Sequence, residues 1–226
     1  MIRINCITEG QSEEAVVREV LAPELGSAGL GLIARSVETG RTGPRIHRGG
    51  MTSFAKAQRD IKRWLAQDPT AYVTTWFDLY RLPTDFPGSA EAQQQADPYR
   101  RTDLLEQAFA RVIGNPRFIP YLQIHEFEGL LFTDPAAMDR MLAVRSSPSQ
   151  LAQLRAIRSD KANPELINDG PTTAPSKRII ALFPGYEKIT SGVRILRSIG
   201  LPTLCSACPH FGEWIKRLRN LTAPLA

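Results

Sequence analysis

Apolar and polar residues along the first 134 positions fall into blocks that switch between a strand-like and a helix-like period. Residues 2–8 ("IRINCIT"), 29–38 ("GLGLIARSVE") and 71–80 ("AYVTTWFDLY") are short, mainly apolar or β-branched runs, as in buried strands. Residues 11–25 and 53–67 repeat apolar side chains every three or four positions, which predicts helices. This alternation predicts an α/β fold with a mostly parallel sheet flanked by helices.

The pattern changes after residue 134. Before that point we expect one more helix over 104–114 and a strand within 118–132, whereas the later segments are short and helix-like. We therefore expect residues 1–134 to form the α/β core and residues 135–226 to form a helical extension packed on it. The segment 40–50, "GRTGPRIHRGG", has four glycines and no apolar periodicity, which predicts a loop.

Composition narrows the class of protein without deciding its function. The chain has 226 residues, 42% hydrophobic and 23% charged, and no apolar run approaches the roughly 18 residues of a membrane span. We expect no secretory signal, because Met1 leads directly into a strand-like run. Three cysteines without a staple pattern favour a reducing compartment, so we expect a cytoplasmic protein. The net charge of +5 is a mild indication of a polyanionic partner such as nucleic acid.

Carboxylates follow three of the predicted strands. Glu9 comes after the first strand with Glu13 one helical turn later, Asp78 ends "YVTTWF", and Glu126 and Glu128 follow "YLQI". Strand ends in a parallel sheet meet at one edge, so these acids should lie together. Clustered carboxylates repel and raise one another's pKa, and such a group is stable only with protons or cations. The donor set suits Mg²⁺, which prefers oxygen ligands.

Basic residues offer the complementary charge. Lys177 and Arg178 in "PTTAPSKRI" are placed to offset the acids, and a lysine beside a metal stabilises charge on a transferred phosphate. Arg41, Arg45 and Arg48 in the 40–50 segment either grip phosphates or belong to a solvated loop. The segment lacks the lysine and serine of a nucleotide-binding P-loop.

Ordinary explanations compete with the functional ones. Glu13 lies near a helix N-terminus, where the helix dipole favours acids, and Asp78 is placed to cap a turn. Strand alternation would point one of Glu126 and Glu128 to the site and the other to solvent or a basic residue, unless a helix starts there. Lys177 is equally well explained as an exposed first-turn residue.

Histidine and cysteine give weaker signals. His125, beside Glu126, is either a ligand or proton carrier or a packed, hydrogen-bonded histidine. The "CSAC" of Cys205 and Cys208 resembles half of a metal-thiolate site, with His210 nearby. No second cysteine pair exists, so two semi-buried thiols are the favoured interpretation.

Four sequence blocks together resemble one family. "ITEGQSEE", "TTWFDLYRLPTDFPG", "QIHEFEGLLFTDP" and "PTTAPSKRI" occur in the order seen in the family of domain of unknown function 4276 (DUF4276), and the likeness runs from Ile2 to "PHFGEWIKRL". That family resembles the TOPRIM fold of topoisomerases, primases and overcoming-lysogenization-defect nucleases. The resemblance implies a TOPRIM-like core with a helical C-terminal extension.

The TOPRIM pattern is a glutamate after strand one and Asp-x-Asp after a later strand. Glu9 and Asp78 match its first two acids, but Tyr80 stands where the second aspartate would be. The "EGxxE" spacing of Glu9 and Glu13 resembles that of the overcoming-lysogenization-defect nucleases, which implies that Glu13, Glu126 or Glu128 substitutes. Relatives often accompany an ATPase in bacterial antiviral systems, so the resemblance also implies an ATPase partner.

The leading hypothesis is a Mg²⁺- or Mn²⁺-dependent phosphodiesterase of TOPRIM type that cuts DNA or RNA. In it Glu9 and Asp78 are the core metal ligands, Glu13 and one of Glu126 or Glu128 complete the shell, and Lys177 stabilises charge. Arg41, Arg45, Arg48 and Arg178 hold the nucleic acid. The rival, motivated by Tyr80, is a non-catalytic regulatory or sensor subunit of an ATPase. A small-molecule phosphotransferase ranks last, for want of a nucleotide loop.

Overall fold

A parallel sheet forms the centre of the molecule. The computed structural model describes residues 1–42, 45–48, 53–144, 148–168, 170 and 172–221. Its main sheet has the order β2-β1-β5-β6, with β7 also pairing with β5, and each of these pairings is parallel. The strands are β1 (Ile2–Thr8), β2 (Leu30–Ser36), β5 (Ala71–Asp78), β6 (Phe118–Ile119) and β7 (Leu122–Gln123). The predicted α/β class with a mostly parallel, helix-flanked sheet is confirmed, and β5 is central, as its apolar sequence indicates.

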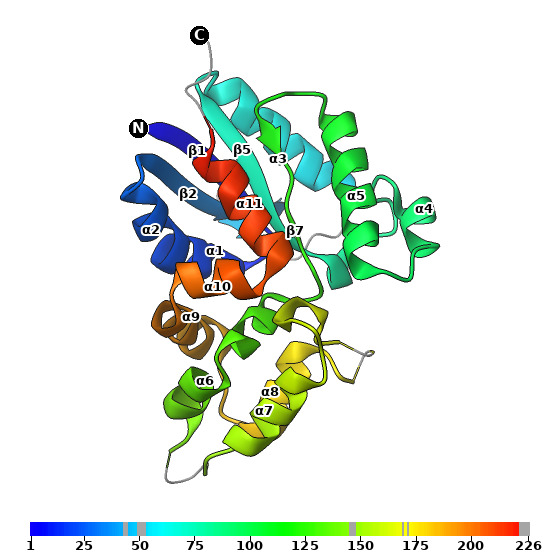
Figure 1. Ribbon diagram of the computed structural model, residues 1–226. Helices are drawn as coiled ribbons and strands as arrows, with labels where there is room; N and C mark the ends of the chain where they lie inside the picture. The colour runs from blue at the N-terminus through cyan, green and yellow to red at the C-terminus, as the bar shows by residue number, and fades with distance from the viewer. Residues whose placement is uncertain (43–44, 49–52, 145–147, 169, 171, 222–226) are drawn as a thin grey trace.

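Helices cover both faces of this sheet (Figure 1). Side chains of β5 alternate between two hydrophobic clusters: Trp76 packs on one face, and Val73 and Phe77 pack on the other. This two-sided burial explains why the strand is apolar almost throughout. The helical segments up to residue 113 are α1 (Gln11–Val16), the π-helix η1 (Val17–Leu21), α2 (Ala22–Gly26), α3 (Phe54–Gln67), the 3-10 turn η2 (Leu79–Arg81), α4 (Ser89–Gln93) and α5 (Pro98–Ile113).

The chain after β7 is helical, and its last helix returns to the sheet. The segments are η3 (Phe127–Thr133), α6 (Pro135–Leu142), α7 (Leu151–Ser159), η4 (Pro164–Leu166), α8 (Pro175–Leu182), η5 (Lys188–Gly192), α9 (Val193–Ile199), α10 (Leu201–Ala207) and α11 (Pro209–Arg219). In Figure 1, α6 to α9 lie beyond the carboxyl ends of the strands, and α11 lies across the sheet. Trp214 of α11 donates its indole N–H to Thr74 Oγ1 at 3.0 Å and stacks on Tyr121 with ring centroids 4.1 Å apart.

The 40–50 segment is not the loop that its glycines predict. Strand β3 (Glu38–Thr42) pairs antiparallel with β4 (Arg45–Arg48) in a separate two-stranded sheet. Backbone hydrogen bonds hold such a ribbon together, so it needs no apolar period that sequence inspection could detect. The side chains of Arg41, Arg45 and Arg48 lie outside the described residues, so their predicted contact with nucleic acid stays a prediction.

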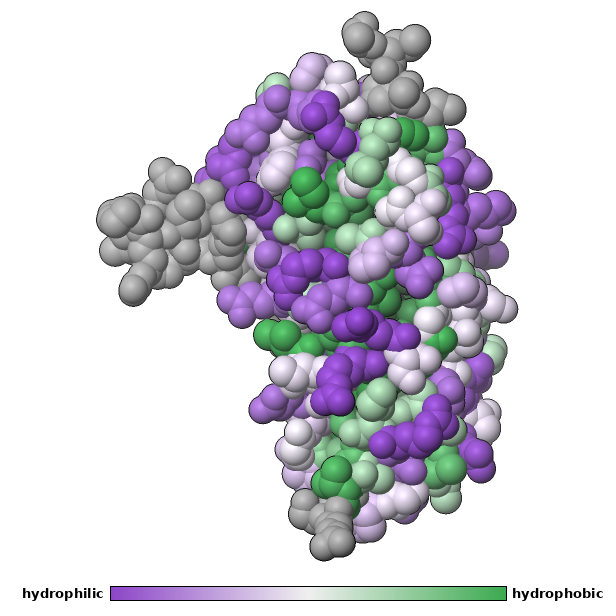
Figure 2. All heavy atoms as spheres, turned by 90° about the vertical axis from the view of Figure 1, so that its left-hand side faces the viewer, coloured by the Kyte–Doolittle hydropathy of each residue, from purple (hydrophilic) through white to green (hydrophobic). Residues whose placement is uncertain are grey.

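Two features of the exterior complete the description. Among the described residues, none of the helices combines the length and apolar character needed to cross a lipid bilayer. On the side that carries β2 and α2, hydrophilic residues are interspersed with smaller hydrophobic areas (Figure 2).

Candidate metal centre at the carboxyl edge of the sheet

Strand register brings the predicted acids to one edge. In the β1–β5 pairing Thr8 lies opposite Trp76, and the backbone N–H of Glu9 donates to the Trp76 carbonyl at 3.2 Å. Asp78, two residues later, is paired with Gln123 of β7. Glu9 and Asp78 therefore leave neighbouring strands at the same level.

Glu13 and Glu126 are oriented by backbone N–H groups. Glu13 Oε2 accepts from the Gly10 N–H at 2.9 Å, so this acid also caps the first helix, as the helix-terminus explanation requires. Glu126 Oε2 accepts from Ser176 N at 3.0 Å, at the beginning of α8. Both carboxylates are buried.

The side chains of Glu126 and Glu128 do not point to opposite sides, which simple strand alternation would predict. A 3-10 turn, η3, begins at Phe127, and both acids are buried, Glu128 with a side-chain exposure of 0%. Glu128 does meet a basic residue, because Lys188 Nζ lies 2.5 Å from its Oε1. The turn therefore keeps both acids at the site.

The electrostatics show that four of the carboxylates act on the fifth, Asp78. Burial raises the pKa of Asp78 well above its usual value, and the charges of Glu13, Glu9, Glu128 and Glu126 raise it further. Within the described part of the chain, Asp78 Oδ1 is buried and has no hydrogen-bond partner. A buried carboxyl that has one unbonded oxygen and four acids acting on it is poorly placed for structural support alone.

Glu128 is perturbed in the same direction. Burial raises its pKa to about 7, an effect that Lys188 opposes and Glu126 reinforces. Burial also disfavours the charged form of Lys188, but Glu128, Glu126 and Asp78 outweigh it and raise the pKa of this lysine. The lysine therefore stays an ammonium beside the acids.

The segment that supplies Lys188 was missed by sequence reasoning. Tyr186, two residues earlier, is buried, and within the described residues its hydroxyl has no hydrogen-bond partner. Glu128 and Glu126 add to burial in raising the pKa of this phenol. "GYEKITSG" carries no known spacing signal, and no pattern in it identifies Tyr186 or Lys188 as neighbours of strand-end acids far away in the sequence.

The donor types in this set suit a hard divalent cation. Five carboxylates offer oxygen ligands, and the unbonded Asp78 Oδ1 supplies an acceptor with no other occupant among the described residues. Glu9, Glu13, Asp78, Glu126 and Glu128 are the residues that would hold it. A bound cation would remove the mutual repulsion that raises the Asp78 pKa.

The predicted basic residues Lys177 and Arg178 both lie on α8. Lys177 is exposed on α8, next to the Ser176 that binds Glu126. Arg178 donates its Nε–H to the Thr173 carbonyl at 2.8 Å and so supports the turn before α8. The proposed charge-stabilising and nucleic-acid-binding roles of Lys177 and Arg178 stay predictions.

His125 and Tyr80 flank the acids. His125 Nδ1 lies 3.2 Å from Asn168 Nδ2, and its backbone has a positive φ of 63°, the left-handed region that few non-glycine residues adopt. Such strain at the residue before Glu126 is typical of a constrained site. Tyr80, at the position of the missing aspartate, is 49% exposed in η2.

A second group, at the α5–α11 junction, combines Asp103, Glu106 and His210. Each offers a ligand atom, and these atoms all lie within 4.8 Å of one another. In the ranges that the structure describes, no other group has that spacing, so the five sheet-edge carboxylates are spread more widely. His210 thus joins α5 acids and not Cys205 and Cys208, which are both free thiols.

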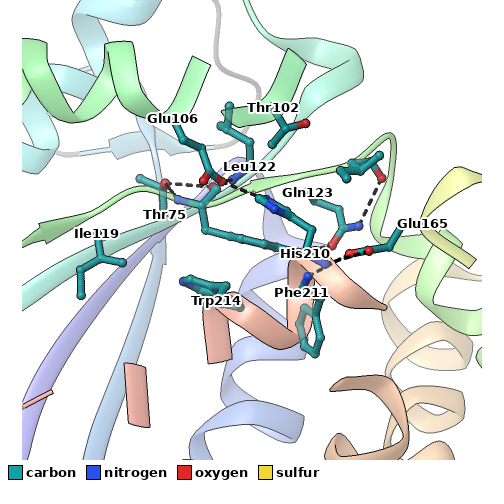
Figure 3. Close-up of polar contacts among 12 residues, drawn as sticks. Thr75, Thr102, Glu106, Ile119, Leu122, Gln123, Glu165, His210, Phe211 and Trp214 are labelled. Carbon is teal, nitrogen blue, oxygen red and sulfur yellow. Dashed lines mark hydrogen bonds and ion pairs between the residues drawn. The ribbon is translucent and has the colours of Figure 1, made fainter. Parts of the chain in front are cut away.

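Hydrogen bonds account for the buried acids of this junction (Figure 3). Glu106 Oε1 accepts from Leu122 N at 2.8 Å and lies 3.0 Å from His210 Nε2. Glu165 accepts from the backbone N–H groups of His210 and Phe211 at 3.0 and 2.9 Å, at the start of α11. Burial opposes the charged form of His210, but the bond to Glu106 and the nearby acids raise its pKa. We interpret this junction as structural.

The family comparison agrees with the sequence blocks. A family model described as Domain of unknown function (DUF4276) matches residues 8–219. Comparison with curated proteins gives no significant match. Among solved structures, the chain is similar to the C-terminal region of the Burkholderia pseudomallei OLD protein, with 16% sequence identity and a TM-score of 0.47, over 97% of this chain and 98% of that chain.

Proposed function

The chain belongs to the DUF4276 family, whose name assigns no activity, and we propose that it is a divalent-metal-dependent nuclease of TOPRIM type that hydrolyses phosphodiester bonds in DNA or RNA. The observation that carries the proposal is Asp78: a buried carboxyl with an unbonded oxygen, on which four further carboxylates act. A structural acid is satisfied by donors, whereas this group is arranged to be completed by a cation.

Each residue of the proposed site is assigned a role according to its position. Glu9 and Asp78 would hold Mg²⁺ or Mn²⁺ at the strand ends, and Glu13 with Glu126 or Glu128 would complete the shell. When bound, the cation supplies charge neutralisation and activation of water for phosphodiester cleavage. Lys177 would stabilise negative charge on the phosphate.

Mutation of the core acids tests the activity. We expect Glu9→Gln and Asp78→Asn each to lose Mg²⁺- or Mn²⁺-dependent cleavage of plasmid DNA and of transfer RNA. The control is Glu91→Gln, because Glu91 is exposed on α4. Equal cleavage by parent and acid-site variants would show that the activity comes from elsewhere.

Nucleic-acid binding has a separate test. Arg41, Arg45, Arg48 and Arg178 would contact the phosphate backbone with little sequence reading. Replacing the three hairpin arginines with alanine should weaken binding of a fluorescent oligonucleotide and flatten its dependence on salt concentration. An unchanged salt slope would remove these arginines from the interface.

The second candidate is a non-catalytic regulatory or sensor subunit of an ATPase complex. Tyr80, which is exposed where the TOPRIM pattern has an aspartate, favours it. Isothermal titration with Mn²⁺ separates the two: absence of binding supports the sensor, whereas binding that Glu9→Gln abolishes supports the enzyme.

The proposed setting is bacterial antiviral defence in the cytoplasm, together with an ATPase partner. It is supported by the family resemblance and by the cysteine usage, which favours a reducing compartment. Co-expression with an ATPase encoded beside this protein tests the partnership. Co-elution in size-exclusion chromatography is expected, and separate elution counts against it.

A further inference from the structure

Lys188 lies at the acidic site, although its segment is distant in sequence from the strand ends. It is the first residue of η5, and its Nζ lies 2.5 Å from Glu128 Oε1 and 5.8 Å from the centre of the Phe127 ring. Phe127 lies between Glu126 and Glu128 in the sequence, so the ammonium lies beside the segment that supplies both acids. Its side chain is 39% exposed while that of Glu128 is 0% exposed, which places a cation at the mouth of a buried acid.

Packing around η5 restricts where this lysine can go. A Cβ atom at Gly192, the last residue of η5, would lie 2.9 Å from the Tyr186 hydroxyl and 3.3 Å from the Phe127 ring. Glycine therefore allows η5 to pack directly against the aromatic residues that border the acids. A cation–π contact with Phe127 adds to the ion pair in holding the ammonium.

The ion pair takes one carboxylate oxygen, Glu128 Oε1, out of the set that a metal ion can use freely. An ammonium in contact with Glu128 Oε1 already neutralises that acid, and it repels any further cation placed there. The second Glu128 oxygen, Oε2, has no hydrogen-bond partner among the described residues, and neither do Asp78 Oδ1 and the Tyr186 hydroxyl. Lys188 therefore contacts one oxygen of Glu128, while the other oxygen and Asp78 Oδ1 stay open to a ligand.

We propose that Lys188 is a resident cation of the acidic site, which holds Glu128 in place of a second divalent ion, so that each chain binds one divalent cation. This inference rests on the proposed metal-dependent function. Removing the ammonium frees Glu128 as a ligand, and the site then accepts a second ion. Lys188 acts through Glu128 and is a positioning residue.

The test counts Mn²⁺ ions per chain by titration, with the electron paramagnetic resonance signal of free Mn²⁺ as the readout. The parent and Lys188→Arg should each bind one ion. Lys188→Met and Lys188→Gln should each bind two, with broadening of the bound signal from coupling between neighbouring ions. Lys216→Met is the matched control, because Lys216 pairs with exposed Glu213 on α11, and it should bind one ion.

Two results overturn the inference. The first is that Lys188→Met or Lys188→Gln, shown to be folded by circular dichroism, still binds a single Mn²⁺ ion with the affinity of the parent. The second is that the parent binds two Mn²⁺ ions. Failure of the proposed metal site looks different, because the parent then binds no Mn²⁺ and Asp78→Asn changes nothing.

Discussion

Two groups of buried acids, at the sheet edge and at the α5–α11 junction, are treated in opposite ways by the fold. At the junction, Glu165 accepts hydrogen bonds from two backbone N–H groups of α11 and from Tyr99, and Glu106 accepts from Leu122 N and faces His210. Donors surround these acids, so their burial is compensated.

At the sheet edge the balance is reversed. Asp78 has an unbonded oxygen, and burial, together with four nearby acids, raises its pKa. The difference gives a way to tell a structural carboxylate from the proposed functional one when both are buried: the first has its donors built in, and the second has an acceptor that the proposed ligand would satisfy. Variants of each group can break or sharpen this distinction.

The largest expected effect is on activity. Asp78→Asn should lower metal-dependent cleavage by at least about 100-fold, because it removes a charged ligand from the proposed site. Glu165→Gln, the matched change in the junction, should leave cleavage within a few-fold of the parent. The rates are measured on one nucleic-acid substrate at saturating Mg²⁺, and equal losses in the two variants would erase the distinction.

The free energy of unfolding should be affected in the opposite order, more by a change at Glu165 than by a change at Asp78. Glu165→Ala leaves two buried N–H groups at the start of α11 and the Tyr99 hydroxyl without their acceptor, and should cost about 3 kcal/mol of unfolding free energy. In metal-free buffer, Asp78→Asn should cost nothing or raise stability, since it relieves repulsion. Urea denaturation monitored by circular dichroism measures both, and a strong loss in Asp78→Asn contradicts the comparison.

A somewhat smaller change in unfolding free energy is expected when the pH of the metal-free protein is varied. Burial raises the pKa of Glu128 from 4.5 to about 7, so the folded state holds a proton that the unfolded state releases between these values. Stability should therefore fall as pH rises from about 4.5 to 7, by roughly 2 kcal/mol for this group. In Glu128→Gln the melting temperature should change less as the pH rises. Added Mn²⁺ should remove the fall in melting temperature in the parent and should have no such fall to remove in the variant.

The smallest expected effect comes from the junction histidine. His210→Gln should cost about 1 kcal/mol at pH 6, because Glu106 keeps its bond from Leu122 N while losing the imidazolium. The pKa of His210 is raised in the folded state, so this contribution is present at low pH and is lost as pH rises through the folded value. Melting curves at pH 6 and pH 9 should differ less for the variant than for the parent.

Secondary structure was predictable where the hydrophobic period is strong. The run 2–8 is β1, the run 71–80 contains β5, and the helix expected at 53–67 is α3 at Phe54–Gln67. The hairpin of β3 and β4 was predicted wrongly as a loop, because its pairing depends on backbone hydrogen bonds and not on buried side chains.

The sequence by itself determined the α/β class, the family and the meeting of Glu9 and Asp78, because parallel strands that end in acid must deliver it to one edge. Tertiary structure decided which groups complete that edge. Lys188 and Tyr186 arrive from a helical segment whose approach is set by packing around Gly192 and Phe127, and no local period encodes such a contact. Whether a buried acid is satisfied, as Glu165 is, depends on donors distant in sequence, which only the folded chain assembles.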